Sequence, residues 1–183
     1  MTTGTLSINP GSVTIFDGPI QTLTESVSGS FDSLRVNGLG VLTLGAALNI
    51  AGMHVTNNTT LDVSANNYAI TVTGNWLIDA GSSFNARSGS VTFNHTGDQS
   101  IASSTFFDVT FSGSGTKSLT GSMTVTDDII INDVTLDAGA FTHIITDDWT
   151  FQNSAILSST GTFSFEGAVL SDINLSNAIN DTT

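Results

Sequence analysis

The sequence predicts an all-β fold built as a parallel β-solenoid, and three observations predict it. Short apolar-x-apolar triplets recur along the chain, as strands with one buried side require. Only 10% of the residues are charged, so Thr, Ser, Asn and Gly must cover the surface, and these residues suit sheets and turns. No stretch carries an apolar stripe at helical period over the roughly ten residues that a helix usually needs.

The triplets give the expected strands in chain order. They are Leu48-Asn-Ile50, Leu61-Asp-Val63, Ile70-Thr-Val72, Trp76-Leu-Ile78, Val91-Thr-Phe93, Val109-Thr-Phe111, Ile129-Ile-Ile131 and Phe163-Ser-Phe165. The triplets that start at Leu48, Ile70 and Val91 follow one another at nearly equal intervals. Turn-forming residues separate the strands, as in 56–59 and 64–67. A period of about 22 residues therefore holds two or three short strands, which is one coil of a solenoid, and the chain has room for about eight coils.

Stacked coils pair each strand in parallel with the same strand of the next coil, at about 4.8 Å, and right-handed coiling is the default for such connections. The residues expected to form inward columns are Ile70, Val72, Trp76, Ile78, Val91 and Phe93. The alternative fold is a β-sandwich, because short strands at even spacing suit it too. A sandwich does not explain a short, regular period nested in a longer repeat.

The longer repeat begins at three glycines. The aligned passages are Gly11-Ser-Val-Thr-Ile15, Gly89-Ser-Val-Thr-Phe93 and Gly161-Thr-Phe-Ser-Phe165, with Phe31-Asp32 matching Phe107-Asp108 and Asn75-Trp76 matching Asp148-Trp149. These matches divide a single repeat-built domain over 1–183 into blocks of approximately 11–88 and 89–160 and a partial block, 161–183.

One stretch resembles a known class of repeats. The run from Gly74 to Ile101, GNWLIDAGSSFNARSGSVTFNHTGDQSI, followed by Phe106–Phe111, is similar to the adhesin-like, filamentous-haemagglutinin-like β-solenoid repeats of very large bacterial surface and secreted proteins. The second unit departs from the pattern, with Asp147-Asp-Trp149 in place of G-N-W and Ser171-Asp-Ile173 in place of Q-x-I. The resemblance implies a non-enzymatic structural or adhesive module, placed outside the cell or on its surface, and it transfers no catalytic residues.

The resemblance leaves two other functions open. The third block stops at Asn180-Asp-Thr-Thr183 without an evident polar cap, and an uncapped solenoid exposes strand edges. The chain is therefore either a fragment or a filament subunit that self-associates end to end through the solenoid ends. Carbohydrate binding or polysaccharide cleavage is the other alternative, and a host or matrix glycan or protein is the expected kind of partner.

The charge balance excludes several classes of partner. The formal net charge is −13, with 16 acidic residues against Arg35, Arg87 and Lys117, so the chain would repel nucleic acid.

Asparagines and glycines interrupt the uncharged stretch 36–61, which argues against membrane insertion. The N-terminus, Met1-Thr-Thr-Gly4, lacks the features of a signal peptide. The absence of cysteine removes disulfides and zinc-thiolate sites.

Two pairs of aspartates are weak candidates for a calcium site. The interval between Asp127-Asp128 and Asp147-Asp148 is close to one coil, so the pairs are expected to stack at neighbouring turns, and Asp133 and Asp137 extend the acidic stretch. Oxygen-rich sites suit calcium, and like charges so close together need a cation or water between them. The alternative interpretation is that these are solvated turn residues. No other cofactor is expected.

An enzyme is not expected. Lyase chemistry wants a basic residue, and the three in this chain are isolated, while the carboxylate pairs fall at turn positions without an aromatic platform. His54, His95 and His143 lack metal-ligand spacing and are expected at the surface or in turns. Trp76 and Trp149 share strand parity with apolar residues, so they are expected in the core.

Overall fold

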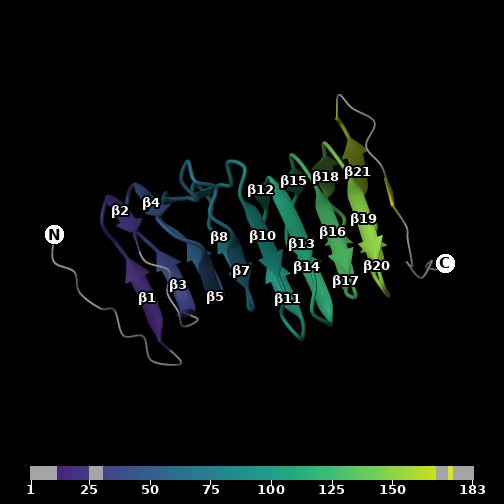
Figure 1. The fold of residues 1–183 in the computed structure, drawn as a ribbon, viewed down its shortest axis with the longest axis horizontal. Coiled ribbons are helices and arrows are strands. Elements are labelled where there is room, and N and C mark those ends of the chain that lie inside the picture. The colour runs from purple at the N-terminus through teal and green to yellow at the C-terminus, as the bar shows by residue number, and fades with distance from the viewer. Residues whose placement is uncertain (1–11, 25–30, 168–172, 175–183) are drawn as a thin grey trace.

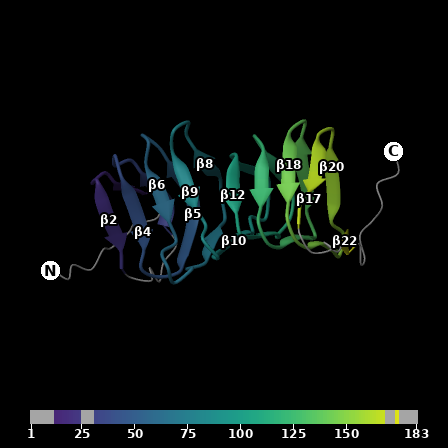
Figure 2. The ribbon, with the colours of Figure 1, turned by 90° about the horizontal axis from the view of Figure 1, so that it is seen from above.

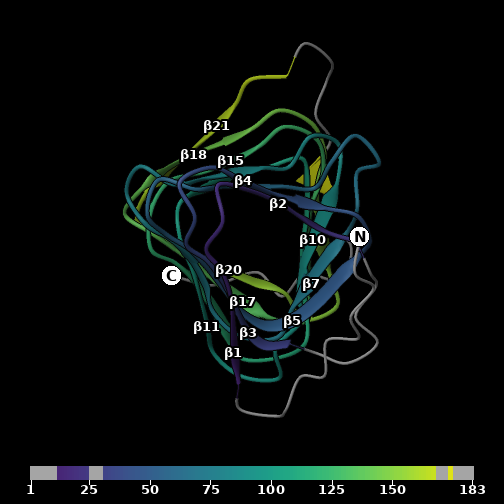
Figure 3. The same cartoon turned by 90° about the vertical axis from the view of Figure 1, so that its left-hand side faces the viewer.

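The computed structural model describes residues 12–24, 31–167 and 173–174. Every paired strand among them runs parallel to its neighbours, and these ranges contain no helix. The chain winds as a β-solenoid of about seven turns, which Figure 1 shows from the side and Figure 3 along the axis. The predicted solenoid is confirmed, and the sandwich is excluded because its sheets would be antiparallel.

Each turn has three sides. Face 1 holds β1 (Val13–Phe16), β3 (Phe31–Val36), the second half of β5 (Leu48–Val55), β8 (Trp76–Ile78), β11 (Gln99–Ile101), β14 (Thr116–Leu119), β17 (Thr135–Gly139) and β20 (Ile156–Ser159). Face 2 holds β2 (Ile20–Leu23), β4 (Val41–Leu44), β6 (Thr60–Asp62), β9 (Ser83–Asn85), β12 (Ser104–Phe106), β15 (Met123–Val125), β18 (Thr142–Ile145) and β21 (Thr162–Phe165). Face 3 holds the first half of β5, then β7 (Ile70–Val72), β10 (Ser90–Phe93), β13 (Asp108–Phe111), β16 (Ile129–Asn132), β19 (Trp149–Gln152) and β22 (Ile173–Asn174).

The strand register gives the length of a coil. Leu48 pairs with Ile70 and Ile70 with Val91, so each interval between these triplets in the sequence is a single coil. Coil length varies along the described chain, because the step from Val91 to its partner Val109 is shorter than the step from Trp76 to its partner Ile101. The extra residues of the longer coils lie in the corners, because the strands themselves keep their pairing.

Alternate residues of each strand point inward and stack on their counterparts in the next coil. Ile70, Val72, Trp76, Val91 and Phe93 are all buried, as predicted, and Ile78 is partly buried. Trp149 is buried too, so both tryptophans are core residues, as the strand parity predicts. Stacking columns of apolar side chains over several coils gives one continuous core, which no single coil could form.

The corners use residues that tolerate a left-handed backbone. Asn57 and Asn58 have φ of 60° and 56°, and Ser64 and Asn67 have φ of 66° and 55°. These four positions fall in the two predicted turns. Asn adopts this conformation more readily than most residues because its side chain can bond the local backbone. The Asn-rich corners therefore let the chain change direction without glycine.

The three glycine-led passages do not occupy equivalent positions. Gly11 lies outside the described residues, and the rest of its passage lies in β1 on face 1. The Gly89 passage forms β10 on face 3, and the Gly161 passage forms β21 on face 2. Trp76 and Trp149 likewise lie on faces 1 and 3. The shared sequence therefore reflects a strand pattern that any face can use.

Face 2 is interrupted once. One sheet on this face ends at β9 and the next begins at β12, with no pairing between them in the described residues. Figure 2 shows β9 and β12 farther apart than any other neighbours on this face. Faces 1 and 3 stay paired across the same two coils, through Trp76 with Ile101 and Val91 with Val109. We call this interruption the seam.

Candidate functional site

Five aspartates line one corner of the solenoid, where the chain passes from face 2 to face 3. Register places Ile129 over Val109 and Trp149 over Ile129, so the residues just before them also stack from coil to coil. We call these residues the aspartate ladder: Asp108, Asp127, Asp128, Asp147 and Asp148. The predicted stacking of the two Asp-Asp pairs is confirmed. Asp108 was missed, although it continues the same sequence spacing by one coil.

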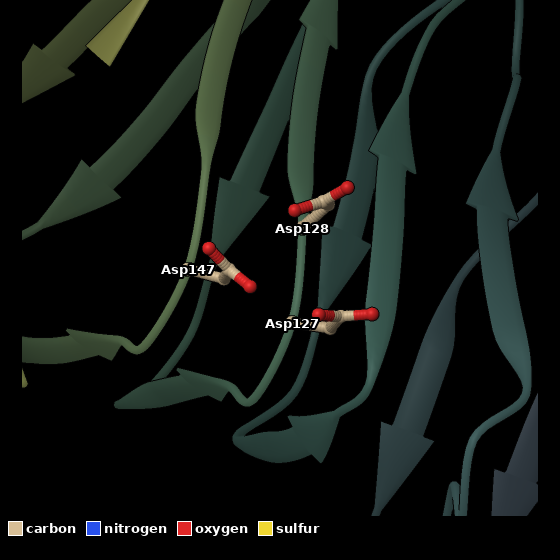
Figure 4. Close-up of side chains that lie close together, drawn as sticks. All are labelled: Asp127, Asp128 and Asp147. Atoms are coloured by element: carbon tan, nitrogen blue, oxygen red, sulfur yellow. The ribbon is translucent and has the colours of Figure 1, made fainter. Parts of the chain in front are cut away.

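Three of the four calcium candidates come together. Side-chain oxygens of Asp127, Asp128 and Asp147 all lie within 4.8 Å of one another, and Figure 4 shows the three carboxylates side by side. The carboxylate of Asp148 lies outside this group of three.

Main-chain hydrogen bonds hold the ladder in register. The Asp128 N–H donates to Asp108 Oδ1 at 3.3 Å, and the Asp148 N–H donates to Asp128 Oδ1 at 3.3 Å. Each of these carboxylates therefore accepts from the backbone of the coil that follows it. The same geometry repeated twice shows that the stacking of the coils sets the positions of these side chains.

The ladder shifts the pKa values of its own carboxyls. Desolvation, the negative charges of Asp108 and Asp128, and a hydrogen bond with Asp108 together raise the pKa of Asp127 to about 6. Desolvation also raises the pKa of Asp128, although the N–H of Asp148 acts in the opposite direction. The corner therefore concentrates negative charge that is unfavourable at neutral pH.

The three clustered carboxylates could supply only part of the coordination shell of a calcium ion. Calcium takes six to eight oxygen ligands, so three carboxylates would supply only part of its shell and water would have to supply much of the remainder. Asp133 does not contribute, because it forms the corner between β16 and β17 with φ of 59°. Asp137 lies within β17 on face 1 and accepts from the N–H of Gly139 at 3.1 Å.

His54 and His143 take part in separate interactions. His54 Nε2 lies 2.9 Å from Asp79 Oδ1 of the following coil at the surface. His143 is fully buried, so the prediction of a surface or turn position is wrong for it. Its Nδ1 accepts from the N–H of Met123 at 3.1 Å, and its Nε2 lies 2.9 Å from the carbonyl of Ala138. These two bonds allow a histidine in the core because they satisfy both ring nitrogens.

Two of the three basic residues hold the scaffold together. Lys117 is fully buried, and its Nζ donates to the carbonyls of His95, Gly97 and Ser114 at 2.7, 3.0 and 3.0 Å. Desolvation lowers the pKa of Lys117. Lys117 lies two residues before Leu119 in β14, and residues two apart in a strand point to the same side. This spacing is the feature of the sequence that could have predicted an inward Lys117. Arg87 binds Asp62 of the preceding coil through both Nε and Nη2, at 2.6 and 2.8 Å.

Comparison of the chain with models of protein families, with curated proteins and with solved structures finds no match. The part of the chain that the structure describes contains no helix that is long and apolar enough to span a membrane.

Proposed function

We propose that this chain is a non-enzymatic structural and adhesive module of a bacterial extracellular protein. The observation that carries the proposal is how the chain uses its buried polar side chains. Gln99 and Lys117 point into the solenoid and donate to main-chain carbonyls at the corner of the preceding coil. Such bonds connect one coil to the next, as a stack of coils under tension requires. They also occupy all three N–H donors of Lys117 Nζ, so none of them is free for catalysis.

The surface composition supports the same role. Face 3 presents a column of outward threonines, in which Thr71, Thr92 and Thr110 pair in register. The resemblance to adhesin-like repeats supports the extracellular location. Short hydroxyl side chains on regular strands give a stiff surface that can contact a partner without a deep pocket.

Adhesion under flow tests this function. Beads that carry the chain through one terminus would be passed over surfaces coated with individual glycans or matrix proteins. We expect retention on at least one surface above that of beads carrying an unrelated β-protein. Retention no greater than that control on every surface, or release of products from a polysaccharide coating, would contradict the proposal.

A specific observation favours self-association as a second candidate. β1 and β2 are end strands of the described sheets, and Val13, Ile15 and Ile20 of these strands are 57%, 52% and 83% exposed. Exposed apolar side chains on an end strand favour pairing with another chain. Light scattering during size-exclusion chromatography should then show a molar mass that rises with protein concentration. The Ile15→Lys variant should abolish this rise. A constant monomer mass would remove this candidate.

A further inference from the structure

The seam on face 2 coincides with a change in the length of one corner, where the chain passes from face 1 to face 2. The corner between β5 and β6 comprises four residues, 56–59, and the corner between β8 and β9 also comprises four, 79–82. The next corner, between β11 and β12, comprises two residues, 102–103. Corners of equal length stack directly, whereas a long corner beside a short one leaves a step. The seam lies at this step.

A groove of about 280 Å³ opens at the step. Its lining includes Ser82 and Ser83 from one coil, Ser103 and Thr105 from the next, and Thr124 from the coil after that. Seven of the nine lining residues are serine or threonine, and none of the nine carries a charge. The groove is thus a neutral site, rich in hydroxyls that can both donate and accept hydrogen bonds.

Two serines on opposite sides of the groove keep hydrogen-bonding capacity that the described residues do not use. Ser82 Oγ accepts from the N–H of Thr59 at 3.4 Å, so its own proton is free to be donated. Ser103 Oγ donates to the carbonyl of Ser122 at 2.7 Å, so its lone pairs are free to accept. The groove therefore offers a donor on one side and an acceptor on the other.

Two threonines extend the polar wall. Thr105 and Thr124 pair in register on neighbouring strands, and both point outward because the residues that follow them, Phe106 and Val125, are buried. Neither threonine hydroxyl has a hydrogen-bond partner among the described residues. A β-branched side chain has few rotamers, so these hydroxyls lose little freedom when a ligand binds.

The two apolar lining residues lie on the core side of the groove. Phe84 is 9% exposed and packs against Trp76 and Phe106, with ring centroids 5.0 and 6.0 Å away. Ile78 is partly buried against the same core. Trp76 Nε1 also donates to Ser104 Oγ at 2.9 Å, which connects the core to the wall of the groove. The groove thus combines rigid apolar contacts on its inner side with hydroxyls on its outer side.

We propose that this groove binds one neutral sugar ring, as the terminal residue of a glycan. A sugar ring carries hydroxyls around its edge and C–H groups on its faces, and the groove offers the matching polar and apolar groups. Its volume is slightly below the roughly 300–1,000 Å³ of sites for drug-sized ligands, so it suits one ring better than a chain of rings. The ring enters from the solvent side of face 2, so β9 and β12 keep their separation.

The inference deepens the proposed adhesive role by naming its ligand class, and it rests on that role only for its biological use. The absence of charge in the lining favours a neutral sugar, because the carboxylate of a uronic acid would find no cation in the groove. The formal net charge of −13 repels such a ligand further. We expect a dissociation constant on the order of 1–10 mM for one ring, because all the hydrogen bonds join neutral groups that water also bonds.

NMR titration of the intact chain tests the inference. The probes are the methyl glycosides of glucose, galactose and mannose, each added to about 100 mM, roughly tenfold above the expected dissociation constant. We expect at least one of them to give saturable shifts of the amide signals of 82–84, 103–105 and 122–124. The methyl uronide of the same sugar differs by its carboxylate and should bind at least tenfold more weakly.

Matched variants separate the groove from the rest of the surface. Thr124→Val removes one hydroxyl and keeps a β-branched side chain in the strand, so the chain should fold while the sugar binds at least fivefold more weakly. The double variant Thr105→Val/Thr124→Val should abolish the shifts. Thr110→Val makes the same change at an outward threonine of β13 on face 3, outside the groove, and should bind as the parent does.

Three results would overturn the inference. They are the absence of saturable shifts with all three neutral glycosides, equal binding of the uronide, and unchanged binding by the double variant. Retention of beads on a protein-coated surface under flow, without any glycoside binding, would overturn only the inference and leave the proposed function standing. Glycoside binding by a chain that retains no beads on any surface would contradict only the adhesive role.

Discussion

Lys117 lies directly over Gln99 in the next coil of face 1, and both side chains end on main-chain carbonyls one coil back. Gln99 Nε2 donates to Val72 at 3.1 Å and also to Gly74, at the corner between β7 and β8. Lys117 Nζ donates to His95 and Gly97, at the corner between β10 and β11. Two different side chains at one stacked position thus hold successive corners in the same way.

Replacement of Lys117 tests this corner clamp. Lys117→Met keeps the volume of the stem but leaves three carbonyls without their donor, so we expect unfolding to become easier by about 3 kcal/mol. Lys117→Gln supplies two N–H donors, as Gln99 does one coil earlier, and should lose about half as much. Urea unfolding followed by tryptophan fluorescence measures both. Equal stability of Lys117→Met and the parent would show that the clamp contributes nothing.

The bidentate pair between Arg87 and Asp62 should stabilise the fold at neutral pH. Asp62 is 8% exposed, and its hydrogen bonds from Arg87 are the main reason that its pKa is lowered. Arg87 has φ of 47°, so Arg87→Asn is the suitable change because Asn tolerates that backbone. We expect a lower midpoint of urea unfolding at pH 7, since Asp62 then keeps its charge without its partner.

The acid dependence of this pair has a defined sign. The pKa of Asp62 is lower in the folded chain than its value of 3.8 in the unfolded chain. The pair therefore stabilises the fold above pH 3.8, and this stabilisation is lost as the pH falls through the folded pKa. The difference between the parent and Arg87→Asn should therefore shrink in that acid range. A difference that stays constant from pH 7 down to pH 2 would show that the ion pair is not its cause.

The aspartate ladder predicts the opposite dependence at milder pH. The pKa of Asp127 is raised to about 6 from 3.8, so the folded chain holds a proton there that the unfolded chain has released. Stability should therefore increase as pH falls from 7 through 6 toward 4. Asp127→Asn should raise the melting temperature at pH 7 by about 1–3 °C and flatten its dependence between pH 7 and 5.

A turn aspartate outside the ladder provides the control for that measurement. Asp133→Asn removes the same charge from a corner whose φ of 59° Asn also accepts. It should leave the rise in melting temperature between pH 7 and 5 intact. If both variants flatten the profile equally, general charge reduction and not the ladder governs the effect.

Calcium distinguishes the two interpretations of the ladder. If Asp127, Asp128 and Asp147 share a calcium ion, 5 mM CaCl₂ will raise the melting temperature above the value in NaCl of equal ionic strength, and Asp147→Asn will remove that increment. If they are solvated turn residues, the two salts will act alike through screening. Differential scanning calorimetry of the parent and the variant decides between these outcomes.

Much of the fold follows from local pattern, because each coil is held by the coils next to it in the sequence. The alternation around Ile70 and Val91 therefore predicts both strand and register. Lys117 and His143 were not predicted as core residues, since their burial depends on carbonyls that only the finished corners and coils present. The seam was not predicted either, because it is a missing pairing between two coils, and strand periodicity describes each strand by itself.

His143 shows how a polar residue in that core can be tested by two independent measurements. The N–H of Met123 donates to Nδ1, so that nitrogen must be unprotonated and the proton must lie on Nε2, which donates to Ala138. Long-range ¹H–¹⁵N correlation spectra at pH 7 should show this Nε2–H tautomer.

His143→Leu should destabilise the chain by about 2–4 kcal/mol, because an N–H and a C=O lose their partners inside the core. His143→Gln offers one acceptor and one donor, and it should recover part of that loss. The opposite tautomer, or a His143→Leu variant as stable as the parent, would show that these two hydrogen bonds do not hold β18 against its neighbours.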